Sequence, residues 1–120
     1  MQNEGKIQNN SPFYPADQFA QARDTQRKSD LREIMSAIYQ YSAAEGTGIM
    51  ESIPQTPTEI GTNPGLVNLE QFLVPKYIFS IPHDPETGST ADTDYAIYQI
   101  NGQVTISARG EATPTISFTQ

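Results

Sequence analysis

One stretch decides the fold of this chain: residues 20–46 read AQARDTQRKSDLREIMSAIYQYSAAEG. Its apolar side chains recur every three or four positions, which is the spacing of one face of an amphipathic helix. These residues are Leu31, Ile34, Met35, Ile38 and Tyr41. Pro15 suits the first turn of a helix and Gly46 suits its end. The pattern therefore predicts a single helix over residues 15–45.

The length of this helix limits how it can be buried. About 31 helical residues measure roughly 46 Å at 1.5 Å per residue. A compact domain of 120 residues has a radius of gyration of only roughly 13–14 Å. We expect the helix from Leu31 onward to pack on the domain and its first turns to protrude. Residues 20–29 carry so many charges that we expect them to lie outside the core.

The remaining residues predict short elements between turns. Gly and Pro punctuate residues 46–64, which favours a loop, and residues 66–73 (LVNLEQFL) have helical spacing before Pro75. Residues 77–81 (YIFSI) form a short apolar run, which predicts either a strand or an extended segment crossing the core. Residues 83–94 are polar and acidic, which is typical of a loop.

The clearest local signal is a β-hairpin. Two alternating runs, residues 95–100 and 103–108, flank Asn101-Gly102, and this dipeptide is typical of a type I′ turn. Residues 115–119 (TISFT) alternate again and predict a third antiparallel strand. One face of the sheet would then pack on the helix through Ile97, Val104 or Ile106, Ile116 and Phe118.

Together these elements predict an α+β fold, with a long N-terminal helix packed on a small antiparallel sheet of three or four strands. The sheet region is expected at residues 77–120. One domain would cover residues 15–120. The polar residues 1–14 are expected to form a disordered N-terminal segment.

Composition excludes several classes of protein. There is no cysteine, so a disulfide framework and a thiolate metal site are both excluded. The net charge is −7, and from Glu45 onward nine acidic residues face only Lys76 and Arg109. Nucleic-acid binding through this region is therefore disfavoured. We find neither a signal-peptide pattern nor an apolar run of roughly 18 residues that would span a bilayer.

Few residues offer chemistry. His83 is the only histidine, so any His-based catalytic triad or metal site would depend on it. The alternative is an exposed loop histidine. Four acids within eleven residues supply the oxygen ligands that calcium uses, although not in the order of an EF-hand. These candidate Ca²⁺ ligands are Asp84, Glu86, Asp92 and Asp94. The alternative is that they are solvated loop acids. We expect no catalytic residue and no required cofactor.

Several motifs, in this order, resemble those of type IV pilin-like proteins, including type II secretion pseudopilins. The first is an ARD-x-x-R-K-S-D-L-x-x-I run between Ala22 and Ile34, and the second is an IP-x-DP motif at residues 81–85, before a strand that contains Tyr95 and Tyr98. Gly102 followed by residues 104–108 resembles the family's G-x-Y-x-L-x-A strand. The resemblance covers residues 15–111 except 47–71. The segment Gly46-Thr-Gly-Ile departs from the family's Gly-x-Tyr-Pro.

The resemblance implies a structural subunit of a type IV pilus-like or type II secretion pseudopilus filament. Such filaments are assembled from copies of one subunit together with other pilin-like subunits, and they serve secretion, adhesion, motility or DNA uptake at the cell surface or envelope. The family begins with a very hydrophobic helix that anchors the subunit in the membrane before assembly. Residues 1–12 are polar, so that anchor is expected outside this sequence. Many major pseudopilins carry a calcium loop near the C-terminus, whereas this chain has TISFTQ there.

The charged residues of the helix have two interpretations. In the first they form a solvated face with pairs three and four residues apart, such as Asp24 with Arg27 and Lys28. In the second they contact neighbouring subunits in a filament. The candidates for filament contacts are Arg23, Asp24, Arg27, Lys28, Asp30 and Arg32.

Two other functions remain as alternatives. A minor pilin or adhesin at a filament tip would use residues 46–64 or 83–94 to bind its ligand. A small soluble enzyme domain would show a deep polar pocket around His83.

Overall fold

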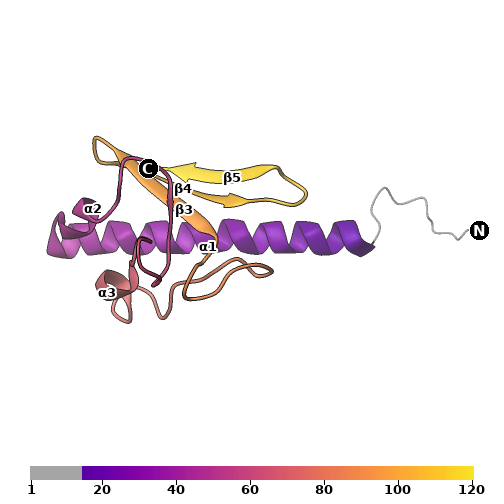
Figure 1. Ribbon diagram of the computed structural model, residues 1–120, viewed down its shortest axis with the longest axis horizontal. Helices are drawn as coiled ribbons and strands as arrows, with labels where there is room; N and C mark the ends of the chain where they lie inside the picture. The colour runs from indigo at the N-terminus through magenta and orange to yellow at the C-terminus, as the bar shows by residue number, and fades with distance from the viewer. Residues whose placement is uncertain (1–14) are drawn as a thin grey trace, which may run out of the picture.

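The computed structural model describes residues 15–120, which form one long helix with a four-stranded antiparallel sheet on one side of it (Figure 1). The helix is α1, Pro15–Glu45, with the bounds that the sequence predicts. The sheet has the order β2-β3-β4-β5. Its strands are β2 (Thr58–Glu59), β3 (Tyr95–Ile100), β4 (Gln103–Arg109) and β5 (Thr115–Thr119). The predicted α+β fold is confirmed, and the predicted disorder of residues 1–14 lies outside the described residues.

The predicted hairpin is present as β3 and β4. Their register runs from Tyr95 opposite Ala108 to Ile100 opposite Gln103. Asn101 and Gly102 both have positive φ, 52° and 83°, as a type I′ turn requires. β5 pairs with β4 as the predicted third strand. The fourth strand, β2, pairs with β3 at the other edge of this hairpin.

Three short segments differ from the sequence prediction. Residues 46–64 are not all loop, because they contain the helical turn α2 (Gly48–Glu51) and strand β2. The helix expected at 66–73 is only α3 (Glu70–Leu73), because the Val67 amide donates instead to the carbonyl of Glu59 at 2.9 Å. Residues 77–81 form no strand; Ile78 and Ile81 are buried whereas Phe79 is 91% exposed. The predicted strand is therefore absent, and the segment contributes Ile78 and Ile81 to the core.

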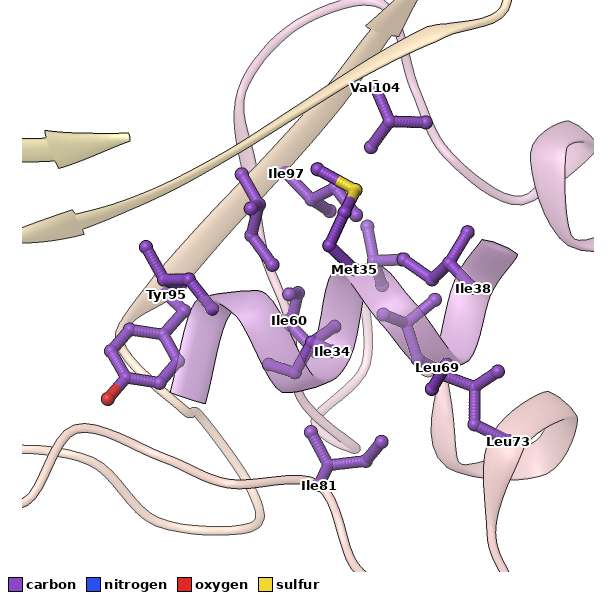
Figure 2. Close-up of a cluster of buried hydrophobic side chains, with 14 of the residues drawn as sticks. Ile34, Met35, Ile38, Ile60, Leu69, Leu73, Ile81, Tyr95, Ile97 and Val104 are labelled. Carbon is purple, nitrogen blue, oxygen red and sulfur yellow. The ribbon is translucent and has the colours of Figure 1, made fainter. Parts of the chain in front are cut away.

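The apolar core packs on two sides of the second half of α1 (Figure 2). Ile97 and Val104 approach the helix from the sheet, while Leu69, Leu73 and Ile81 lie on its opposite side (Figure 2). Both Val104 and Ile106, which the sequence left as alternatives, are buried. α1 is therefore held between the sheet and the segment that contains α3 (Figure 1).

One face of α1 remains uncovered along its length. Its exposed residues recur with helical spacing and we call them the exposed stripe: Thr25, Gln26, Ser29, Arg32, Glu33, Ser36, Tyr39, Gln40 and Ala43. Residues 15–22 are exposed except for the half-buried Ala20, and they extend beyond the sheet (Figure 1). The predicted protrusion is confirmed. Within residues 15–120, no helix has both the length and the apolar character needed to cross a membrane.

Candidate functional site

Arg27 lies at the centre of a set of charged side chains between α1 and two loops, and this set is buried at Arg27, Asp24 and Asp84 and partly exposed at its border. We call this set the Arg27 network: Arg23, Asp24, Arg27, Asp84 and Glu111. The Arg27 side chain is 2% exposed. Its Nε and Nη2 donate to the two carboxylate oxygens of Asp84 at 2.7 and 3.1 Å, and its Nη1 donates to Asp24 at 2.8 Å and Glu111 at 2.7 Å. The planar fork of a guanidinium allows this bidentate contact, which an ammonium group does not reproduce.

Asp24 fastens the turn between β4 and β5 to the helix. Its carboxylate accepts the backbone N–H groups of Glu111, Ala112 and Thr113 at 3.0, 2.9 and 3.0 Å. The turn is tight at Gly110, where a Cβ would lie 1.6 Å from the carbonyl oxygen of Thr113. The turn thus directs three amides at one buried carboxylate, which compensates the loss of water around it.

Asp84 fastens the second loop, residues 83–94. Besides Arg27, its carboxylate accepts the N–H groups of Glu86 and Thr87 at 2.9 and 3.0 Å. The Asp84 amide donates to the carbonyl of Thr93 at 2.9 Å, so the loop closes on itself. Gly88 permits this closure, because a Cβ there would lie 2.4 Å from the oxygen of Thr93.

Two further contacts border the network. Arg23 forms a bidentate pair with Glu111, with both distances at 2.6 Å. One turn further along α1, Asp30 accepts a hydrogen bond of 2.6 Å from the hydroxyl of the fully buried Tyr95 and one of 2.7 Å from Gln26. Charged and polar contacts therefore continue from the projecting end of α1 to the start of the apolar core.

The electrostatics keep the network ionised. Burial alone would raise the pKa of Asp84, but the hydrogen bonds from Arg27 and from two backbone amides hold it well below its usual range. The same balance lowers the pKa of Asp24. Arg23 and then Arg27 lower the pKa of Glu111 to about 2. Since every carboxylate here binds a cation or an amide, the arrangement fastens α1 to the two loops.

The structure separates the six predicted filament-contact residues into two groups. Asp24, Arg27 and Asp30 are buried and bonded within the chain. Arg23 is half-exposed and paired with Glu111, Lys28 is half-buried, and Arg32 is exposed above the ring of Phe118 at 4.6 Å. The Asp24–Arg27 pair expected from the sequence is present as an ion pair three residues apart.

The expectation that residues 20–29 are too charged for the core is wrong. Asp24 and Arg27 continue the helical face of Leu31 and Ile34, with steps of three or four residues, and all four side chains are buried. This spacing was visible in the sequence. Sequence analysis missed Glu111 and Tyr95 as partners because nothing local connects them to the helix.

The four calcium candidates do not converge in the structure. Asp84 faces Arg27, Asp94 binds Arg109 at 2.6 Å, and Asp92 shares a hydrogen bond with Glu59. Glu86 is exposed. Across residues 15–120, no three His, Cys, Asp or Glu side chains are grouped as metal ligands.

His83 is exposed, as the loop-histidine alternative has it, and its Nδ1 lies 3.2 Å from the backbone oxygen of Asp84. Comparison with family models, with curated proteins and with solved structures finds no match for this chain. The functional argument therefore starts from the geometry of α1 and its contacts.

Proposed function

We propose that this chain is a pilin-like structural subunit that polymerises through α1 into a filament of the cell surface or cell envelope. The observation that carries the proposal is the exposure of α1. The helix extends beyond its own domain at residues 15–22 and keeps the exposed stripe along the rest of its length. A short projecting helix is marginally stable in water when nothing packs on it. Packing between copies of α1 supplies the missing contacts.

The Arg27 network gives this proposal a mechanical basis. A filament transmits load along its subunits, so the helix that makes the contacts has to be firmly joined to the rest of the domain. Asp84 and Glu111 join α1 to two loops at the place where the helix leaves the sheet. Directional, fully satisfied bonds at this position resist rotation of the helix against the sheet.

The same geometry narrows the candidates for contacts between subunits. Asp24, Arg27 and Asp30 are buried and form contacts within the chain. We therefore assign the contacts between subunits to Lys28 and Arg32, and to the partly exposed Arg23 at the edge of the Arg27 network. Contacts of this kind are heterologous, and they propagate without closing. The resemblance of the motifs at residues 22–34 and 81–85 to those of pilin-like proteins supports the proposed filament subunit. It also implies a membrane-anchored precursor.

Single introduced cysteines test the proposal, because the chain has none of its own. Ser29→Cys and Ser36→Cys place a thiol on the exposed stripe, and Ser117→Cys places one on an exposed position of β5 as the matched control. Each variant is expressed in the source cells, and surface filaments are labelled with an antibody raised against this chain. A short bismaleimide then joins neighbouring thiols.

We expect labelled filaments, with covalent dimers from the two helix variants and fewer from Ser117→Cys. Unlabelled filaments, with all three variants recovered as monomers, would contradict the proposal.

A further inference from the structure

The turn of the β3–β4 hairpin contains the only Asn-Gly dipeptide of the sequence, Asn101-Gly102. Both residues are exposed, at the end of the sheet nearest α2 (Figure 1). A Cβ built on Gly102 would meet no atom within 4 Å, so the space beside this residue is open. The chemistry of the dipeptide therefore depends on its own conformation and hydrogen bonds.

An Asn-Gly dipeptide is prone to spontaneous deamidation, because glycine has no side chain to hinder the reaction. The backbone nitrogen of Gly102 would lose its proton to water or hydroxide and attack Cγ of Asn101. A five-membered imide then forms, and the side-chain nitrogen takes up a proton and leaves as ammonia. Water opens the imide at either of its carbonyl carbons, which gives an aspartyl or an isoaspartyl residue.

In the folded chain the attacking nitrogen is held by Gln99. The N–H of Gly102 donates to Oε1 of Gln99 at 2.9 Å. A backbone N–H can only donate, so the oxygen end of the Gln99 amide faces the turn. Gln99 is itself fixed on β3, because its own N–H donates to the carbonyl of Pro54 at 2.9 Å and it lies opposite Val104 in the hairpin.

The backbone of the turn opposes the reaction as well. Asn101 and Gly102 have φ values of 52° and 83°, which the type I′ geometry requires. Ring closure needs a rotation about the Cα–C bond of Asn101, and this rotation would carry the Gly102 N–H away from Gln99. The hydrogen bond to Gln99 therefore opposes both the loss of the proton and the rotation.

We propose that Asn101 is a deamidation site that Gln99 protects in the folded chain. The site becomes reactive when the hairpin opens or when Gln99 is replaced. An isoaspartyl residue would add a methylene group to the main chain and a carboxylate to the turn, so it would disrupt the pairing of Ile100 with Gln103. This inference does not depend on the assembly of the chain.

Mass spectrometry of the purified chain tests the protection. The folded protein is incubated at mildly alkaline pH, and the deamidated forms of the tryptic peptide 77–109 are measured over time. We expect Gln99→Ala to deamidate roughly two- to tenfold faster than the unsubstituted chain, which is the factor that one net hydrogen bond supplies. Gln99→Glu keeps an oxygen acceptor at the same position and should remain as slow as the unsubstituted chain.

The matched control is Gln103→Ala, which removes an exposed glutamine on the other side of the turn and should leave the rate unchanged. In concentrated urea all four proteins should deamidate at one common and faster rate, because the protection belongs to the fold. Equal rates for the unsubstituted chain in buffer and in urea would overturn the inference. So would equal rates for this chain and Gln99→Ala in buffer, or a Gln99→Glu variant that reacts as fast as Gln99→Ala.

Discussion

The two halves of α1 each bury part of their surface, but by different chemistry: the first half buries Asp24, Arg27 and Asp30, and the second buries apolar side chains from Leu31 onward. Arg27 in the first half and Ile34 in the second are both almost inaccessible to water. The apolar half gains free energy from removing hydrocarbon from water, and this gain depends little on direction. The charged half gains little net free energy from burial, because desolvation offsets the attraction between its charges. The charged half instead contributes specificity, because its contacts permit only one arrangement of the helix relative to the two loops.

Replacing Arg27 should have the largest effect on the free energy of unfolding. Arg27→Met preserves much of the side-chain volume but leaves Asp24, Asp84 and Glu111 without their shared cation. Removing one partner of a buried charge pair costs about 3–5 kcal/mol. We expect a loss of that size in the free energy of unfolding measured with urea.

Arg32→Met is the matched control, because Arg32 is exposed, and it should cost less than about 1 kcal/mol. Equal losses in the two variants would show that the Arg27 network is not buried as described.

Conservative substitutions in the two halves should also differ in their cost to stability, although by less. Arg27→Lys keeps the charge but cannot hold both oxygens of Asp84 and also reach Asp24. Each lost hydrogen bond to a charged group costs about 1.5–3 kcal/mol. Ile34→Val removes one buried methylene group and should cost about 0.5–1.5 kcal/mol.

Urea unfolding of both proteins measures the difference. A smaller loss for Arg27→Lys than for Ile34→Val would contradict the argument that the charged half depends on geometry.

Local signals explain which parts of the fold were predictable. The spacing of Leu31, Ile34 and Ile38 predicts the helix, and Asn101-Gly102 predicts the hairpin, because each pattern acts within a few residues. The shortened α3 was not predictable, because the bond from Val67 to the carbonyl of Glu59 joins two separate segments.

The partners of the Arg27 network lie much further apart. Asp84 and Glu111 lie 57 and 84 residues from Arg27 in the sequence, and no local pattern pairs them. The burial of Asp24 and Arg27 could be predicted from the sequence, since both continue the helical face of Leu31. The density of charge in residues 20–29 favoured an exposed surface instead. A charged residue that keeps the spacing of an apolar face is therefore better interpreted as a buried pair whose partners remain to be found.

Acid should weaken the charged half and spare the apolar half. The pKa values of Asp24, Asp84 and Glu111 are lowered in the folded chain, below unfolded values of about 3.9 for Asp and about 4.3 for Glu. Below these unfolded values the unfolded chain binds more protons, so stability falls as the pH decreases. We expect the free energy of unfolding to decline from about pH 5 downward.

Ile34→Val should show the same decline as the unsubstituted chain, whereas Asp84→Asn should show a shallower one. Urea midpoints across an acidic pH series measure both. Parallel curves for all three proteins would locate the acid sensitivity outside the network.

The smallest expected effect has the opposite sign and comes from the other end of the loop at residues 83–94. There Asp92 meets Glu59 rather than a cation, and this hydrogen bond, together with burial and the nearby charge of Asp94, raises the pKa of Glu59 to about 7. Between the unfolded value of about 4.3 and about 7 the folded chain binds more protons. Stability therefore falls as the pH rises through this range.

Glu59→Gln keeps a hydrogen-bond donor for Asp92 and removes the titration, so it should flatten that fall and increase stability at alkaline pH. Glu51→Gln, at an exposed position of α2, is the matched control and should retain the slope. Thermal midpoints between about pH 5 and about pH 8 measure the difference. If Glu59→Gln keeps the slope of the unsubstituted chain, the contact with Asp92 does not raise the pKa of Glu59.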